Sequence, residues 1–345
     1  HFAHQTFNWS NEAKSNAAVH VVIVGFASFD TTNKKIFEYE NIKAEAHEKI
    51  VKNITPYLVE GDDIVIEKRR KPICDVPNIS FGSMPNDGGN FLLTDEEKEE
   101  LIKQEPLSEK YIKPLLSASE FLNGKNRWCL WLEDLNPNDL KSMPLVKQRV
   151  ENVKKLREES SREATKKLAE YPTLFGEIRQ PKTEYIGIPL NTSGNRIYIP
   201  FGYFPKDFIS NNTMSVVAKS SLFHFGVLAS IMHMNWIKYI CGRIKSDYRY
   251  SNELVYNNYP FPKDVNEKQK LAVEEKAQNV LNIRASFNDC SLADLYDPLS
   301  MPPNLKKAHQ ELDKAVDNCY GTKSFKNDKE RIEFLFGLYE EYLGE

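Results

Sequence analysis

Four charged side chains occur at every second position in one short stretch, CGRIKSDYRYSNELVYNNYPFP, residues 241–262. They are Arg243, Lys245, Asp247 and Arg249. Successive side chains of a β-strand point to opposite faces, so this spacing predicts an extended strand with one charged face. Such a face offers hydrogen-bond donors and one acceptor, which suits recognition.

Duplex DNA is a partner with matching chemistry. In the major groove, guanine presents the N7 and O6 acceptors that lysine or arginine can satisfy, and cytosine presents an N4 donor that a carboxylate can accept. Lys245 and Asp247 could therefore read both bases of one G·C pair, and Arg249 could contact the next base or a phosphate. The alternative is a surface charge ladder that protects an edge strand from aggregation. The spacing leaves both interpretations open.

The sequence contains no recognisable catalytic centre. It lacks the glycine-rich nucleotide-binding loops, the H-E-x-x-H zinc motif and the G-x-S-x-G nucleophile motif. We therefore expect no catalytic residue and no metal site. His224 and His233 lie in an apolar stretch with helical spacing, where a hydrogen-bonded core histidine is the expected role.

Composition limits the classes of protein that the chain can belong to. Of its 345 residues, 41% are hydrophobic and 28% are charged, as in ordinary globular proteins. The five scattered cysteines argue against a disulfide framework or structural zinc and favour a reducing cytoplasm. The longest apolar run, residues 17–29, is too short to cross a membrane. The chain begins with His1 and not Met, so we expect a piece of a longer protein.

Charge is unevenly distributed along the chain. The formal net charge is −3, but residues 176–263 contain ten Lys/Arg against five Asp/Glu, and residues 264–345 contain eleven against sixteen. An amphipathic segment, residues 145–171, has eight basic and four acidic residues between Lys147 and Lys167. It predicts either a solvated helix with internal ion pairs or a helix along a phosphate backbone.

The pattern of apolar runs and turns divides the chain into three regions. In residues 1–70, the run at 17–29 predicts a fully buried central strand, and KKIFEYE predicts its hairpin partner. Because one hairpin cannot bury such a strand on both faces, we expect the other strands of the sheet to lie upstream.

The second region, residues 71–262, begins with a linker rich in Pro, Gly and Asn, followed by a helix with a Thr94–Glu97 capping box. RWCLWLED predicts a strand, and TEYIGIPLNTSGNRIYIPFGYF predicts two strands joined at Ser193–Gly194. The stretch SLFHFGVLASIMHMNWIKYICGRI predicts one buried helix. Three acidic helices are expected in residues 263–345. The fold class is mixed α/β (α+β).

Long segments resemble the MmeI-like (type IIL) restriction and modification enzymes. The likeness includes HFAHQTFNWSNEAKSNAAVHVVIVGF, KPICDVPNISFGSMPNDGGNFLLT, SSLFHFGVLASIMHMNWIKYICGRIKSDYRYSNELVYNNYPFP and LYDPLSMPPNLKKAHQELDKAVDNCYG. It spans essentially the whole chain. The resemblance implies the end of a methyltransferase domain at 1–70, a target recognition domain at 71–262 and a C-terminal helical domain at 263–345.

The resemblance also implies a function for the parent protein, which would transfer a methyl group from S-adenosylmethionine to adenine N6 in duplex DNA. The family's glycine-rich cofactor loop and Asn-Pro-Pro-Tyr tetrapeptide are absent from this sequence. We therefore expect this chain alone to bind no cofactor and to be inactive. The implied partners are double-stranded DNA and an upstream methyltransferase domain in the same polypeptide. A fused nuclease is left open.

Site residues follow by the same resemblance. Phe7 and Trp9 would form an aromatic wall for a flipped adenine, with ordinary core packing as the alternative for Trp9. Lys245, Asp247 and Arg249 match the region where relatives place base-contacting residues. Weaker candidates for groove or phosphate contacts are Arg243, Arg196, Asn212, Thr213, Arg179 and Lys182.

Two other classes of function stay open. The chain could be a protein-interaction scaffold whose acidic C-terminal region contacts a basic partner. It could instead bind structured RNA, although the A-form major groove is too narrow for the proposed side chains.

Overall fold

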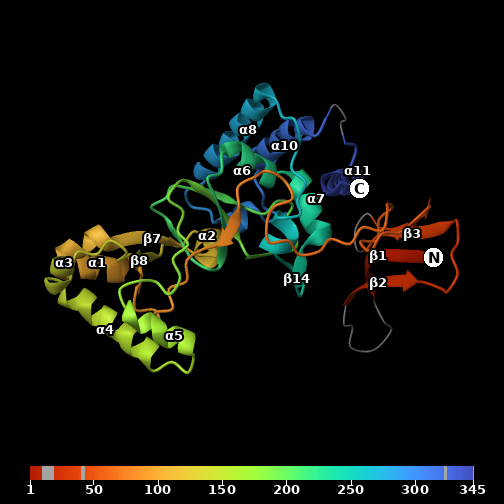
Figure 1. The fold of residues 1–345 in the computed structure, drawn as a ribbon. Helices are drawn as coiled ribbons and strands as arrows, with labels where there is room; N and C mark the ends of the chain where they lie inside the picture. The colour runs from red at the N-terminus through yellow and green to blue at the C-terminus, as the bar shows by residue number, and fades with distance from the viewer. Residues whose placement is uncertain (10–18, 40–42, 322–324, 345) are drawn as a thin grey trace, which may run out of the picture.

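The computed structural model describes residues 1–9, 19–39, 43–321 and 325–344. These residues form a mixed α/β fold, which confirms the predicted class. Three parts follow one another along the molecule (Figure 1). An N-terminal sheet lies at one end, a largely helical lobe lies at the other, and a body that includes the C-terminal helices lies between them.

The N-terminal sheet differs from the predicted hairpin. Its strands are β1 (Phe2–Trp9), β2 (Val19–Gly25), β3 (Lys34–Glu38) and β4 (His47–Val51), in the spatial order β2-β1-β3-β4. β1 pairs with both β2 and β3, so it separates the two strands that were expected to pair.

The predicted burial of residues 17–29 relied on strands upstream of His1, so this chain alone does not test it. β2 is an edge strand, and Val22 and Val24 are 50% and 53% exposed. Residues 17 and 18 lie outside the described residues. An apolar run indicates that a strand requires burial, but it does not specify which neighbour supplies it.

The lobe has its own hydrophobic core, which includes Phe91, Leu130 and Val146. Its helices are α1 (Asp95–Gln104), η1 (Pro106–Tyr111), α3 (Pro137–Lys141), α4 (Pro144–Glu158), α5 (Glu163–Lys167) and η2 (Leu168–Glu170). Helix α2 (Ala118–Asn123) instead lies against the body (Figure 1), where Phe121 packs on Phe204. A small sheet has the order β12-β7-β8-β6, formed by β6 (Leu92–Leu93), β7 (Ile112–Leu116), β8 (Trp128–Leu130) and β12 (Ile209–Ser210). The capping box at Thr94 and Glu97 is confirmed.

The body is built on a second four-stranded sheet. It contains β5 (Ile79–Phe81), β9 (Tyr185–Pro189), β11 (Gly202–Phe204) and β13 (Met214–Ala218), in the order β11-β9-β13-β5. β9 and β11 pair as expected, but Ser193–Gly194 does not join them directly. The intervening chain instead forms β10 (Asn191–Thr192), which belongs to a different sheet.

Two helices carry the chain from this sheet to the charged stretch. The predicted single helix is divided into α6 (Leu222–Leu228) and α7 (Ile231–Ile240). Ser230 between them has extended backbone, and the Asp313 carboxylate accepts a hydrogen bond of 2.7 Å from the first amide of α7, that of Ile231. Because this cap comes from a residue far along the chain, the local pattern gives no sign of the break between the helices and predicted one helix.

The C-terminal helices pack directly on the body. They are α8 (Glu267–Ala285), the short α9 (Leu292–Leu295), α10 (Pro303–Cys319) and α11 (Asp328–Leu343). One continuous apolar cluster runs from Val59 through Trp236 to Tyr339. The three long helices match the prediction, and their core is shared with the helices that precede the charged stretch.

Candidate nucleic-acid interface

The charged stretch forms a β-hairpin and not the predicted single strand. β14 (Gly242–Ile244) and β15 (Asp247–Arg249) are antiparallel and are joined by Lys245 and Ser246. Lys245 has a φ of +57°, in the left-handed region that allows a tight reversal. The alternating charges predicted a strand, and the sequence at Lys245 and Ser246 contains no strong signal for this turn.

The hairpin register distributes the four charged residues differently from the prediction. Directly opposite residues of an antiparallel pair share a face. Ile244 is opposite Asp247, so Asp247 and Arg249 share a face with Ile244, whereas Arg243 is opposite Tyr248 on the other face. The four residues therefore do not form one row, because Lys245 occupies the turn. Each of the four is exposed.

Arg243 has partners within the hairpin. Its guanidinium carbon lies 4.3 Å from the ring centroid of Tyr248, and Nη1 donates a 2.9 Å hydrogen bond to the Ser246 carbonyl. These contacts fix the turn, so Arg243 supports the hairpin from the side opposite Asp247.

β10 completes a three-stranded sheet in the order β10-β15-β14. Asn191 of β10 is opposite Arg249 and shares its face. Asn191 is exposed and was not singled out from the sequence, because only the tertiary pairing brings it to the hairpin. An amide beside a guanidinium adds a donor and an acceptor to this face.

The loop after β10 supports the hairpin turn. The Gly194 amide donates a 3.2 Å hydrogen bond to Oδ1 of Asp247. A Cβ added at Gly194 would lie 2.1 Å from the carbonyl oxygen of Ser246, so the two backbones meet where only glycine fits. Asp247 therefore has a structural contact in addition to its exposed position.

Arg196 does not fit the predicted groove contact. It is only 9% exposed, and its Nη1 is hydrogen-bonded to Oγ1 of Thr192 beneath the sheet. Burial lowers the pKa of its guanidinium from the ordinary value. The turn preference of Ser193–Gly194 placed Arg196 on a surface hairpin, whereas the fold packs it inside.

The turn containing Asn212 and Thr213 lies next to this sheet. The Thr213 carbonyl accepts a 3.1 Å hydrogen bond from Leu190, whose own carbonyl accepts a 2.8 Å bond from Tyr250. Asn212 is exposed at the turn. The Thr213 hydroxyl already donates to Asn211 at 2.6 Å and accepts from the Ala118 amide at 2.9 Å, so its side chain holds the turn.

Arg179 and Lys182 lie in the neighbouring segment. The Arg179 amide donates a 3.0 Å hydrogen bond to Oγ of Ser83, and its guanidinium forms an ion pair with Glu177. Lys182 is exposed. Both side chains can be reached by a phosphate, but Arg179 would have to give up its ion pair with Glu177 to bind one.

Helix α4 does not present its predicted basic face freely. Three of its lysines form i,i+4 ion pairs of 3.8 to 3.9 Å, namely Lys147–Glu151, Lys154–Glu158 and Lys155–Glu159. Exposed pairs of this kind stabilise a helix only slightly, but they neutralise its charge. The pairing favours the interpretation of a solvated helix.

Phe7 and Trp9 lie on the same face of the N-terminal sheet as His4 because β1 contains a bulge. The three-residue step from His4 to Phe7 is opposite the two-residue step from Ile23 to Val21. The extra residue returns Phe7 and Trp9 to the face of His4.

The side chains on this face stack closely. Phe7 stacks on Tyr39 with centroids 5.1 Å apart, and His4 stacks on Phe37 at 4.1 Å. Trp9 is 48% exposed, so no core within the described residues encloses it. The face offers flat aromatic surfaces of the kind on which a base can stack.

Comparison with protein families accounts for nearly the whole chain. The models described as "MmeI, DNA-methyltransferase domain", "MmeI, target recognition domain" and "MmeI, C-terminal domain" match residues 1–38, 60–263 and 265–345, respectively. The chain belongs to the MmeI family. The resemblance identified from the sequence is thereby confirmed.

Two similar proteins give the extent of the match. This MmeI-family chain is 41% identical over 341 residues to DNA methyltransferase A of Bacillus subtilis (strain 168), covering 99% of the chain and 38% of that protein. It is 44% identical to the type IIL restriction-modification enzyme MmeI, solved in complex with DNA, with a TM-score of 0.85. The second match covers 100% of this chain and 46% of that one, so the chain spans less than half of each relative.

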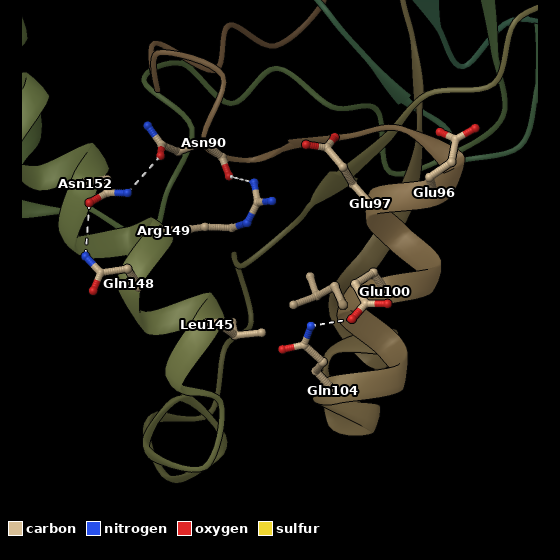
Figure 2. Close-up of a pocket in the computed structure, with 10 residues that line it drawn as sticks. Asn90, Glu96, Glu97, Glu100, Gln104, Leu145, Gln148, Arg149 and Asn152 are labelled. Carbon is tan, nitrogen blue, oxygen red and sulfur yellow. Dashed lines mark hydrogen bonds between the residues drawn. The ribbon is translucent and has the colours of Figure 1, made fainter.

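Two grooves of this MmeI-family chain differ in chemistry. One, of about 660 Å³, lies between α1 and α4 (Figure 2). Its α1 wall carries Glu96, Glu97 and Glu100, which would repel phosphates. The other, of about 730 Å³, lies beside the hairpin and is lined by Lys68, Asn191 and Arg249, among others. The hairpin groove is the better candidate for contact with nucleic acid.

The described part of this MmeI-family chain adds two negative findings. No group of three or more His, Cys, Asp or Glu is arranged to hold a metal ion among residues 1–9, 19–39, 43–321 and 325–344. Within the same ranges, no helix is both long and apolar enough to cross a bilayer.

Proposed function

We propose that this chain recognises the target sequence for an S-adenosylmethionine-dependent adenine-N6 DNA methyltransferase and reads duplex DNA through the major groove. The observation that carries the proposal is the exposed hairpin β14–β15. A two-stranded β-ribbon fits the width of the B-DNA major groove, so a hairpin is a better probe than the single strand predicted from the sequence. The family match and the DNA complex of the similar MmeI enzyme support the same conclusion.

Each side chain in the proposal has a distinct task. Lys245 at the turn donates to guanine N7 or O6, and Asp247 accepts from N4 of the paired cytosine. Arg249 and its neighbour Asn191 contact the adjacent base pair or its phosphate. Lys182, Asn212 and Arg179 are secondary candidates for contacts with the DNA backbone, which position a protein without reading sequence.

The proposal assigns the aromatic face to the methyltransferase reaction. Phe7 and Trp9 stack against the target adenine after it leaves the duplex, since its N6 cannot be reached within the base stack. The methyl donor binds to the methyltransferase domain of the parent protein. The exposed edge of β2 pairs with a strand of that domain, which would cover Val22 and Val24. We place the parent protein in the cytoplasm.

An exchange of the two reading residues tests this proposal. In the full-length protein, the double variant Lys245→Glu with Asp247→Arg should change the preferred pair from G·C to C·G at one position, because donor and acceptor have been swapped. Each good contact contributes about 1–3 kcal/mol of discrimination. Methylation of a duplex library, read by sequencing, measures the preference.

The variant Asp247→Asn serves as the matched control. Its amide oxygen can still accept from Gly194, so the hairpin is retained, but its amino group faces the N4 donor of cytosine. It should lose discrimination at the pair without gaining the inverted preference. An unchanged site in the double variant would return these residues to a surface charge ladder. Competition with an RNA duplex distinguishes the two nucleic acids.

A further inference from the structure

A second basic element lies beside the hairpin, far from it in sequence. Residues 68–71 are Lys68, Arg69, Arg70 and Lys71, here called the basic strap. Lys68, Arg70 and Lys71 are exposed, and Arg69 is half-buried. Among the described residues, none of the four forms an ion pair, in contrast to the lysines of α4.

The position of the basic strap is fixed by the segment that follows the hairpin. The π-helical turn η3 (Asn252–Tyr256) begins three residues after β15. The Arg69 amide donates to the Glu253 carbonyl at 2.9 Å, and Nδ2 of Asn257 donates to the Arg69 carbonyl at 2.7 Å. Both bonds use the backbone of the strap, so its side chains are left free to bind another molecule.

The strap and the hairpin border the same groove. Lys68 lines the 730 Å³ groove together with Arg249 and Asn191 of the three-stranded sheet. Glu253 also lines this groove and partly offsets their charge. The strap adds unpaired positive charge at the rim, where a duplex held by the hairpin would bring its phosphates.

We propose that the basic strap binds the phosphate backbone of the duplex that the hairpin reads. This inference rests on the proposed function, since it assigns a further contact to the same interface. Flexible cationic side chains on a fixed backbone can bind successive phosphates without selecting a base. The strap would therefore set the affinity and the position of the hairpin in the groove, but not its sequence preference.

The test compares salt dependence in the full-length protein. Binding to a cognate duplex is measured between about 50 and 200 mM salt for the native protein and for Lys68→Ala with Arg70→Ala. Each lost phosphate contact should reduce the slope of log affinity against log salt by about 0.9. We expect a reduction of about one to two, with the same rank order among duplexes that differ at single base pairs.

The control removes the same charge from another surface. Lys306 and Lys307 are exposed on α10, which lies at the opposite side of the body from β14 in Figure 1. Lys306→Ala with Lys307→Ala should leave the slope nearly unchanged. Thermal unfolding of both double variants checks that they fold, and the strap keeps its backbone hydrogen bonds in either case.

The possible outcomes separate the two proposals. If the native protein binds no duplex, the proposed function fails and this inference fails with it. If the native protein binds specifically but the strap variant matches the α10 control, only the strap inference is overturned. A changed rank order of sequences in the strap variant would also contradict it, because phosphate contacts carry no base information.

Discussion

Arg157 holds together distant segments of the lobe through one buried side chain. It is 1% exposed, and its five N–H groups donate to five backbone carbonyls at 2.8 to 3.1 Å. The acceptors are the carbonyls of Pro85, Asn86, Leu168, Tyr171 and Leu174. The guanidinium therefore joins the loop before α1 to the segment that follows α5.

We predict that Arg157→Lys destabilises the lobe. Lysine has three donors in place of five and lacks the planar fork, so at least two buried carbonyls would lose their partners. Each loss costs about 1–3 kcal/mol, so two losses should lower the free energy of unfolding by about 2–6 kcal/mol.

Urea denaturation of Arg157→Lys and of a second α4 variant, Arg149→Lys, measures the loss of stability. Arg149→Lys is the control, since Arg149 is only half-buried and donates one hydrogen bond, to the Asn90 carbonyl at 2.8 Å. Equal midpoints for the two variants would show that the carbonyl cluster does not depend on the guanidinium.

The hairpin is positioned by the loop after β10, which meets it through an uncharged glycine, Gly194. Gly194 contacts the turn at Ser246 and donates to Asp247. A similar close approach occurs at Gly82, where an added Cβ would lie 2.2 Å from the Asn211 carbonyl oxygen. Two loops that lack side-chain bulk thus bring the hairpin and the 211–213 turn to one surface.

We predict that Gly194→Ala weakens duplex binding in the full-length protein by about tenfold or more, equivalent to about 1.4 kcal/mol. The new methyl group forces the Ser246 backbone away, and the turn carrying Lys245 moves with it. Affinity at fixed salt is measured by fluorescence anisotropy.

Gly337→Ala in α11 is the control for this loop variant, since no atom lies within 4 Å of its added Cβ. It should leave binding unchanged. If Gly194→Ala binds as tightly as the native protein, the loop does not set the position of the hairpin.

For the whole molecule, the shared core of the body contains buried titratable groups that make stability depend on pH. His233 and His309 are fully buried, and burial lowers the pKa of each to about 3. Nε2 of His233 is 3.2 Å from the Tyr250 hydroxyl, and Nε2 of His309 is 2.8 Å from that of Tyr296. Asp313 behaves oppositely, since burial raises its pKa to about 7.

These pKa shifts change the stability of the fold with pH in opposite directions. The folded pKa of each histidine lies below the unfolded value of about 6.5, so its contribution is lost as pH falls from about 6.5 toward 3. The folded pKa of Asp313 lies above its unfolded value, so its ionisation removes stability as pH rises from about 4 to 7. His224, whose pKa burial also lowers, acts in the same direction as the two buried histidines, so together they outweigh Asp313 and the net effect favours neutral pH.

We predict that the free energy of unfolding falls by about 1.4 kcal/mol for each pH unit between about 6 and 4. His309→Gln should make this dependence less steep, because one of the histidines whose pKa burial lowers is removed. Denaturant unfolding at several pH values, followed by tryptophan fluorescence, measures the slope. An equally steep slope in the variant would contradict the assignment to His309.

Several features of this chain follow from its sequence alone. Local capping chemistry specified the start of α1 at Thr94, and apolar spacing specified the three long C-terminal helices and the core position of His233. The long motifs specified the family. These features depend on neighbouring residues or on long identical patterns, which a sequence displays directly.

The tertiary structure decided the arrangement of the candidate site. It folded residues 242–249 into a hairpin, paired Asn191 with Arg249, buried Arg196 and brought the basic strap beside the groove. It also placed β1 between the two strands expected to pair. Strand order, register and burial arise from contacts between residues far apart in the chain, and side-chain periodicity specifies a face without specifying what lies against it.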